Sequence, residues 1–250
     1  MRDDTELYGV LRLLEFGLND CQIARVTGVP RATVRDWRRA RWRDRRVDWR
    51  VDARKCEVCA GRPPHPPEAP YAYLLGLYLG DGCISRAPRA YRLRIVLDAA
   101  YPRIIEECAA ALKAVRPPNR VWCGRHGSSR CVVVSMFWQH WPCVLPQHGP
   151  GRKHLRQIVL QPWQEAIVSN QHRPFLRGLI HSDGCRVVAN DRGVASIRYH
   201  FSNLSEDIKN LYCASLDELG IPWTRPSGKD IAVYRKSATA VLDEFIGPKR

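Results

Sequence analysis

The chain of 250 residues is long enough for one large domain or for a small and a mid-sized one, and its 45% hydrophobic content supports a buried core. Its 40 Lys and Arg residues outnumber 25 Asp and Glu residues, and the net charge of +15 favours a polyanionic partner such as nucleic acid. No hydrophobic run reaches the length of a membrane span and the charged N-terminus lacks a signal-peptide pattern, so we expect a cytoplasmic, nucleoid-associated protein that contacts no membrane.

Residues 1–50 show the hydrophobic spacing of three short helices, which predicts a separate all-α module. The second helix carries Ala24, a small residue that lets two helices touch. Gly28, four residues later, permits a tight turn, and Val34, six further on, fixes the third helix against the second. This spacing is typical of a helix-turn-helix, and the stretch resembles the short modules of resolvases and transposases.

The third helix of this module is strongly basic. Between Arg31 and Lys55 there are 11 basic and 4 acidic residues, a local net charge of +7. A purely structural three-helix bundle does not need that charge, so we predict that this helix contacts DNA. The side chains best placed for that contact are Arg31, Thr33, Arg35, Arg38 and Arg39.

Residues 51–70 have the composition of a linker, because four of the five residues 63–67 are prolines. Within it, Cys56 and Cys59 have the spacing of one half of a zinc site, but no second CxxC completes the four ligands. The missing ligands would have to come from other residues, namely His65, Cys123 or His126. Two reduced cysteines are therefore the preferred interpretation, and a structural zinc ion is the alternative.

The ten cysteines of the chain are scattered rather than arranged as a disulfide framework. Because no secretory signal precedes them, we expect free thiols. Two of them, Cys83 and Cys185, follow apolar segments and are expected to be small core residues.

Two nine-residue segments of the chain, 74–82 and 176–184, match each other. Their sequences are LLGLYLGDG and LRGLIHSDG, each is followed by a cysteine, and Asp81 and Asp183 are 102 residues apart (183 − 81). Each segment is predicted to be a helix that ends at a glycine C-cap. Small residues four apart leave one face of each helix flat for close packing: Gly76 with Gly80, and Gly178 with Ser182.

The aspartate before each terminal glycine suggests the chemistry of this region. A carboxylate at a helix C-terminus is unfavourable by itself, because the helix carbonyls already place negative potential there. Two such carboxylates brought together repel each other unless a cation neutralises them. A divalent ion that prefers oxygen ligands, Mg²⁺ above all, would satisfy Asp81 and Asp183.

The two segments resemble the LAGLIDADG motif of homing endonucleases, and the resemblance covers residues 71–250. It implies an α+β domain of two αββαββα repeats, in halves 71–170 and 171–250, with the motif helices packed at a pseudo-dyad. The sheets would form a saddle on double-stranded DNA, and Asp81 and Asp183 would hold the metal ions. The internal pseudo-dyad makes a monomer sufficient.

The same order of elements follows each motif. In the first half we predict a strand, a helix, a hairpin and a helix: 91–97, 101–115, 121–137 and 138–145. In the second half we predict a strand, a helix, a strand pair and a helix: 194–202, 206–219, 223–234 and 238–245. Each half then reaches a glycine-proline turn and a lysine, Lys153 or Lys249. The resemblance implies that these lysines stabilise charge near the scissile phosphates, and ordinary phosphate or solvent contact is the alternative.

The chain departs from the motif where Leu79 and His181 replace its first aspartate, a variable position; His181 is expected to be a buried, hydrogen-bonded packing residue. The preferred hypothesis is sequence-specific DNA binding with metal-dependent, site-specific cutting, and no small-molecule substrate. The alternative is a non-cutting transcription regulator, since this fold occurs fused to a helix-turn-helix in actinobacterial regulators. An intein-embedded endonuclease does not fit, because the sequence shows no splicing blocks.

Overall fold

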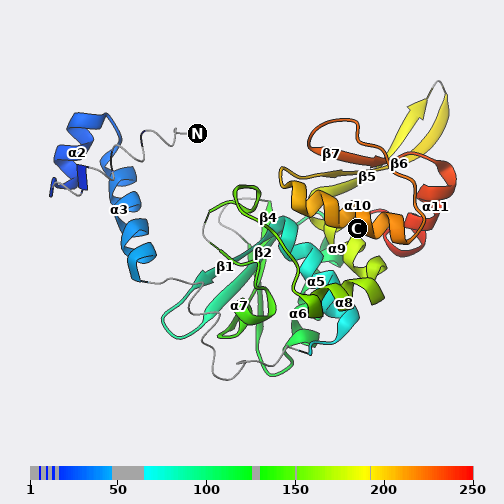
Figure 1. Ribbon diagram of the computed structural model, residues 1–250, viewed down its shortest axis with the longest axis horizontal. Coiled ribbons are helices and arrows are strands. Elements are labelled where there is room, and N and C mark those ends of the chain that lie inside the picture. Colours follow the sequence, from blue (N-terminus) through cyan, green and yellow to red (C-terminus); the bar gives the residue numbers. More distant parts are fainter. Residues whose placement is uncertain are drawn as a thin grey trace. The chain divides into compact units, whose positions relative to one another are not determined.

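The computed structural model describes residues 6, 10, 13–14, 17–46, 65–125, 130–149, 151–191 and 193–249, without the side chains of residues 39–46 and 191. The chain divides into two compact units, Met1–Lys55 and Cys56–Arg250 (Figure 1). In the described part of the chain, no helix is both long enough and apolar enough to cross a membrane.

The first unit contains helices α2 (Asp20–Thr27) and α3 (Arg31–Arg46). Asn19 caps α2 by accepting hydrogen bonds from two backbone N–H groups of its first turn. Gly28 ends α2 with a φ of +69°, a left-handed conformation that favours glycine. Of the unit's described residues, four have buried side chains that form a hydrophobic core: Val10, Ile23, Val29 and Val34. The turn at Gly28 and the buried Val34 thus occur where the helix-turn-helix spacing requires them, and the helix-turn-helix itself stays a prediction.

The second unit is α+β and is built from two similar successions of elements. The first half contains α5 (Glu68–Asp81), β1 (Gly82–Arg86), β2 (Tyr91–Asp98), α6 (Pro102–Val115), β3 (Val121–Arg125), β4 (Cys131–Trp138) and α7 (Trp141–Val144). The second contains α9 (His172–Asp183), β5 (Gly184–Asp191), β6 (Val194–Ser202), α10 (Glu206–Glu218), β7 (Asp230–Val233) and α11 (Lys236–Phe245). A 3₁₀ turn (Lys153–Leu155) and α8 (Pro162–Asn170) connect them. The α5 helix begins at Glu68, inside the stretch predicted as linker.

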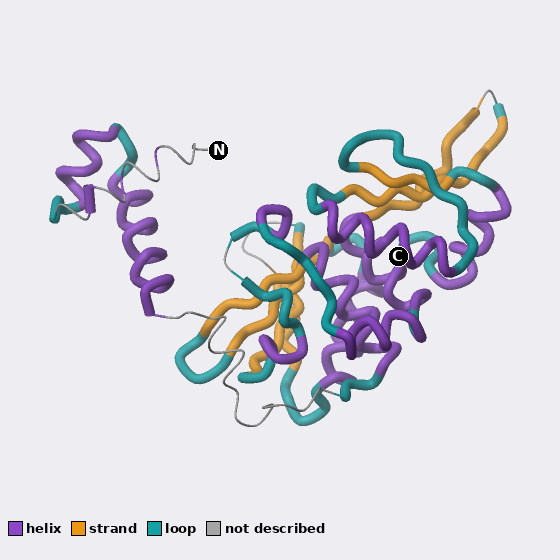
Figure 2. The backbone as a smooth tube through the Cα atoms, viewed as in Figure 1, coloured by secondary structure: helices purple, strands orange, loops and turns teal. Residues whose placement is uncertain are grey.

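Each half forms its own antiparallel sheet, as the two groups of orange strands in Figure 2 show. The strand orders are β1-β2-β4-β3 and β5-β6-β7. The second sheet therefore has one strand fewer than the predicted αββαββα repeat, and only a single bridge from Thr224 to Ala232 stands in place of the fourth strand. Pro222 and Pro226 explain the difference, because proline lacks the N–H group that a ladder needs.

The two motif helices, α5 and α9, pack against each other with their backbones in contact (Figure 1). A Cβ atom added to Gly178 would lie 2.2 Å from the carbonyl oxygen of Tyr73, and one added to Gly76 would lie 2.5 Å from that of Phe175. Only glycine fits such a crossing. The predicted flat helix faces are therefore present, and the main hydrophobic core surrounds this helix pair.

The prediction that Cys83 and Cys185 are core residues is wrong, because both thiols are exposed. Each cysteine is the second residue of the strand that follows its motif helix. Successive side chains of a strand point to opposite faces of the sheet, and the cysteines fall on the face away from the core. On that face the cross-strand neighbour of Cys83 is Arg94, and that of Cys185 is His200.

Candidate functional site

The ends of α5 and α9 bring the two motif aspartates to one place. Asp81 and Asp183 are the last residues of their helices, and in each case the next glycine donates its N–H to the carbonyl four residues before it. A Cβ atom added to Gly80 would lie 2.2 Å from Ser182 Oγ and 3.1 Å from Asp183 Cγ. The carboxyl group at the end of α9 therefore lies directly beside the end of α5.

The two lysines predicted from the glycine-proline turns reach these same helix ends. Lys153 Nζ donates to the carbonyl oxygens of Gly80 (2.9 Å) and Gly82 (2.6 Å), on either side of Asp81. Lys249 Nζ donates to the carbonyl oxygen of His181 at 3.0 Å. Each ammonium group thus places a positive charge where the helix carbonyls carry negative potential.

The carboxyl groups are half-buried, and this burial dominates their electrostatics. Burial and, to a smaller extent, the negative charge of Asp183 raise the pKa of Asp81 to about 6, against the opposing effect of Lys153 and Lys249. Burial lowers the pKa of Lys153 to about 8. The ammonium groups of Lys153 and Lys249 supply positive charge that offsets the repulsion between the two carboxylates. The carboxylates can therefore lie together without a bound metal.

Asn203, which follows β6, is a site residue that the sequence analysis missed. Its Nδ2 donates to Asp183 Oδ2 at 2.6 Å. Burial raises the pKa of Asp183, and this hydrogen bond is the largest influence that lowers it. Nothing in the residues around position 203 marks the asparagine, because only the fold brings it to the carboxylate.

A pocket of about 460 Å³ opens beside Asp183. It lies between the end of α5, the basic segment 151–156 and the residues that follow β6. Its polar lining includes Lys153, His154, Arg156, Asp183, Ser202 and Asn203. Basic side chains next to carboxylates suit a phosphate group that is to be placed near a cation.

Asp81 and Asp183 supply only part of the ligands that a divalent cation needs, so other ligands must complete its coordination. Among the described residues no three His, Cys, Asp or Glu side chains converge on one point. Mg²⁺ is commonly held by one or two carboxylates, with waters and substrate phosphates filling its octahedron. Asp81 and Asp183 can therefore hold such an ion when a phosphate is present.

A second group of missed residues lies on the outer face of the first sheet. Arg92 contacts two exposed aromatic rings, with its guanidinium carbon 5.5 Å from the ring centre of Trp122 and 5.4 Å from that of Phe137. Its Nε and Nη2 donate to the buried hydroxyl of Ser135 at 3.3 and 3.0 Å. These contacts fix the guanidinium before any partner binds.

His181 has the packing role that was expected. It is buried, its Nδ1 lies 2.9 Å from the hydroxyl of Tyr73, and the two rings meet edge to face. Burial and, to a smaller extent, the positive charges of Arg177 and Lys249 lower its pKa to about 3. The imidazole is therefore neutral at physiological pH and does not act as a cation.

The residues predicted to meet DNA in the first unit differ in their surroundings. Arg31 and Arg35 are exposed, and Thr33 is half-buried. Arg38 forms an ion pair with Asp20 at 2.7 Å, which ties α3 to the start of α2. The side chain of Arg39 lies outside the described residues.

The alternative of a zinc site concerns residues that are mostly not described. Cys56, Cys59 and His126 lie outside the described residues. His65 and Cys123 are described, and both are exposed. The zinc site therefore stays a prediction.

Solved structures of LAGLIDADG proteins are similar to this chain. The homing endonuclease I-DmoI in complex with DNA and Mn matches with a TM-score of 0.48 and 14% identity, covering 73% of this chain and 98% of that one. The N-terminal LAGLIDADG domain of DUF199/WhiA matches with a TM-score of 0.47 and 17% identity, covering 80% of this chain and 91% of that one. The homing endonuclease I-WcaI bound to its DNA recognition sequence matches with a TM-score of 0.48 and 10% identity, covering 81% of this chain and 88% of that one. No protein-family model and no curated protein matches the sequence. The likeness is one of fold, at identities too low to transfer a residue role.

Proposed function

We propose that this protein binds double-stranded DNA at a specific sequence and cuts it with the help of a divalent cation, acting as a monomer. One observation carries the proposal: the two repeated helices bring Asp81 and Asp183 together, with Lys153 and Lys249 beside them. The outer sheet face around Arg92 would contact the DNA, and the exposed arginines of α3 would add a second contact.

The chemistry is the hydrolysis of a phosphodiester. A water oxygen forms a bond to phosphorus while the bond to the leaving sugar oxygen breaks, and that oxygen takes up a proton. A divalent cation held by Asp81 and Asp183 would lower the pKa of the attacking water and offset the charge on the phosphate. Lys153 and Lys249 add positive charge beside the same phosphate. The pKa of Lys153, about 8, keeps it cationic at neutral pH and close to releasing a proton.

The second candidate function is a transcription regulator that binds DNA without cutting it. The contacts of the lysines favour it, because Lys153 and Lys249 are engaged with the helix carbonyls and already neutralise the carboxylates. Carboxylates whose negative charge is already offset by lysines can have a purely structural role where α5 and α9 meet. Both candidates share the DNA-binding surface and differ in whether a phosphodiester is broken.

The test is incubation of a randomised double-stranded DNA library with the full chain in Mg²⁺ or Mn²⁺, followed by sequencing of the ends and of the retained DNA. The wild type is compared with Asp81→Asn/Asp183→Asn. The matched control is Glu165→Gln, which removes an exposed carboxylate of α8 that does not line the pocket. We expect discrete cuts with the wild type and the control, and none with the double variant.

Retention of a selected sequence without cutting, by all three proteins and in both ions, would contradict the nuclease and leave the regulator. Absence of any selected sequence would contradict both candidates. Cutting that persists in the double variant would remove the aspartates from the reaction.

A further inference from the structure

The amide of Asn203 is fixed in one orientation. Its Oδ1 accepts a hydrogen bond from the backbone N–H of Ser205 at 2.8 Å. A backbone N–H can only donate, so the oxygen must face Ser205 and the NH₂ group must face Asp183. Its contact with Asp183 Oδ2 is therefore a donated hydrogen bond that holds this carboxylate and leaves Oδ1 for another ligand.

Among the described residues of the first half, no side chain donates such a hydrogen bond to Asp81. In the second half Asn203 lies two residues before the N-cap of α10 and donates its backbone N–H to the carbonyl of Lys229 at 2.9 Å. In the first half Ala99 lies two residues before the N-cap of α6 and donates its backbone N–H to the carbonyl of Arg130 at 2.8 Å. Counted from the motif helices, the residue in the place of Asn203 is the buried Leu97, because Gly184 pairs with the residue two before Asn203 and Gly82 pairs with the residue two before Leu97. Neither alanine nor leucine has a side chain that could donate a hydrogen bond to Asp81.

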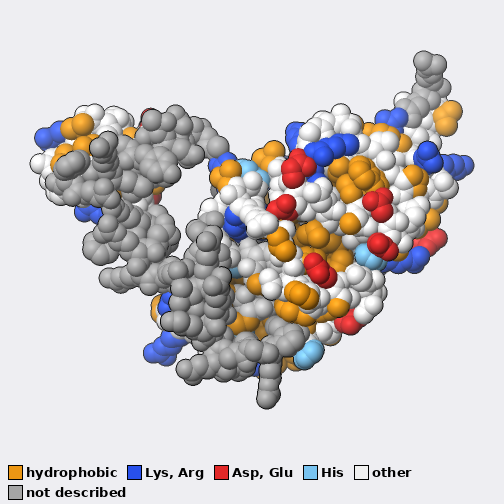
Figure 3. Space-filling view, in the orientation of Figure 1, with side chains coloured by type: hydrophobic (Ala, Val, Ile, Leu, Met, Phe, Trp, Pro, Cys, Tyr) orange, Lys and Arg blue, Asp and Glu red, His pale blue; other side chains and the backbone are white. Residues whose placement is uncertain are grey.

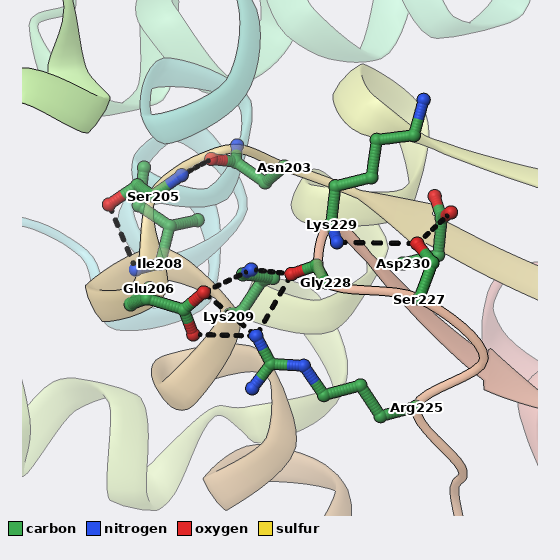
Figure 4. A network of polar contacts seen from close by, with 10 residues as sticks. All are labelled: Asn203, Ser205, Glu206, Ile208, Lys209, Arg225, Ser227, Gly228, Lys229 and Asp230. Carbon is green, nitrogen blue, oxygen red and sulfur yellow. Dashed lines mark hydrogen bonds and ion pairs between the residues drawn. The ribbon is translucent and has the colours of Figure 1, made fainter.

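A network of charged groups supports the segment that holds Asn203 (Figure 4). The carbonyl of Gly228, next to Lys229, accepts hydrogen bonds from the buried Lys209 and from Arg225. Both cations also contact Glu206 at the start of α10, at 2.6 and 2.7 Å. Residues 225–230 are thereby tied to the helix that Asn203 precedes, so the position of the asparagine is determined before a cation or DNA binds.

We propose that Asn203 is a positioning residue that makes the two carboxylates of the site unequal. Asp183, held by the amide, is the stronger ligand for a divalent cation, and Asp81, without a matching donor, is the weaker one. Its consequence for DNA rests on the proposed function: in a protein that cuts both strands, unequal carboxylates mean that one strand of the duplex is cut before the other. The unequal affinity of the two carboxylates for a cation is a property of the protein itself, whether or not the protein cuts DNA.

The direct test measures Mn²⁺ binding by electron paramagnetic resonance on full-length single-aspartate variants. Asp81→Asn leaves only Asp183, and Asp183→Asn leaves only Asp81. We expect Asp81→Asn to bind Mn²⁺ more tightly than Asp183→Asn. Adding Asn203→Ala to Asp81→Asn should weaken binding by about 10- to 100-fold, the usual effect of removing a group that orients a metal ligand.

The reciprocal variant separates positioning from simple loosening of the fold. Adding Asn203→Ala to Asp183→Asn should leave Mn²⁺ binding by Asp81 unchanged, because the amide contacts only Asp183. Ser205→Ala is the control, because it removes the side-chain cap of α10 and leaves the contact between Asn203 and Asp183 in place. In the Asp81→Asn background this control should leave Mn²⁺ affinity unchanged.

In DNA, the wild type should accumulate a duplex nicked in one particular strand. Asn203→Ala should reduce this accumulation, because it removes the difference between the two carboxylates. An unchanged strand preference, or Mn²⁺ affinity that does not respond to Asn203→Ala, would overturn the inference while cutting itself could persist. Loss of Mn²⁺ affinity on Asn203→Ala in a protein that never cuts would sustain the inference and contradict the nuclease.

Discussion

Burial and the charge of Asp183 raise the pKa of Asp81 to about 6, above the ordinary value of 3.8 that it has in the unfolded chain. The folded protein therefore binds this proton more tightly than the unfolded chain does. It follows that the contribution of the carboxyl group to the free energy of unfolding decreases as the pH rises from about 4 to about 6, and is constant above that.

Replacing Asp81 by Asn removes this titration. We expect the melting temperature of Asp81→Asn to gain on that of the wild type between about pH 4 and pH 6, and the difference to stay constant from there to pH 7. Thermal unfolding at several pH values measures it, with Glu165→Gln as a control that should follow the wild type. Parallel curves for wild type and Asp81→Asn would show that this carboxyl group has an ordinary pKa.

Among the individual site residues, the sequence predicted those that occur at matched positions of both halves and missed those that occur in one half alone. Asp81 and Asp183 stand at matched positions of two similar helices, and Lys153 and Lys249 follow matched turns. Neither matching position of the first half, Leu97 or Ala99, holds an asparagine, so no repeat points to Asn203. Its role depends on a contact across 20 residues of sequence, which only the fold creates.

The crossing of α5 and α9 has little tolerance for a larger side chain. A Cβ atom on Gly178 would overlap the backbone of Tyr73, which cannot move without the whole helix. We expect Gly178→Ala to reduce the free energy of unfolding by about 1–3 kcal/mol or more, which lowers the melting temperature by roughly 2–4 °C per kcal/mol. Gly228→Ala is the control, because a Cβ atom there meets nothing within 4 Å. Equal melting temperatures for the two variants would mean that the helices do not cross this closely.

The outer face of the first sheet carries a further prediction. Arg92 is held by Ser135 and contacts the rings of Trp122 and Phe137, so lysine cannot reproduce its planar contacts. We expect Arg92→Lys to weaken binding of a selected DNA sequence by about 1–3 kcal/mol, the range for losing one bidentate base contact. Arg89→Lys, at an exposed arginine of the turn before β2, should bind normally in the same titration. Equal affinities for all three proteins would place the DNA elsewhere.

The elements themselves were predictable where periodicity and turns agreed, as in β2, α6, β6 and α10. The pairing of strands was harder, because a strand forms only if its neighbour offers free backbone groups. The stretch around Thr224 is apolar enough for a strand, yet its two prolines reduce it to one bridge. Both prolines are visible in the sequence, and they could have corrected the prediction.

Across the whole molecule the positive charge is shared between the two units. Residues 1–55 carry 14 basic and 9 acidic side chains, and residues 56–250 carry 26 and 16. On the face drawn in Figure 3, basic, acidic and hydrophobic side chains of the described residues are interspersed. Each unit thus has excess positive charge for contact with phosphates, and the salt dependence of DNA binding reports how many of these contacts form.

We expect Arg31→Ala/Arg35→Ala in the full chain to reduce the slope of log K against log salt concentration by about 1–2, since each lost phosphate contact removes about 0.9. Arg38→Ala serves as the comparison, because its ion pair with Asp20 already engages this arginine. It should leave the slope nearly unchanged and lower the stability of the first unit. An unchanged slope in the double variant would mean that α3 does not touch the DNA.

The burial of α5 also has a consequence during synthesis of the chain. Nine consecutive residues of this helix, Tyr71 to Leu79, are buried in the folded protein, and its main partner α9 begins 91 residues after α5 ends (172 − 81). At roughly 5–20 residues per second, the ribosome needs on the order of 5–20 s to make that stretch. For those seconds the side of α5 that faces α9 is uncovered in the nascent first half, so chains stalled between the two motifs should be the ones that aggregate or recruit chaperones.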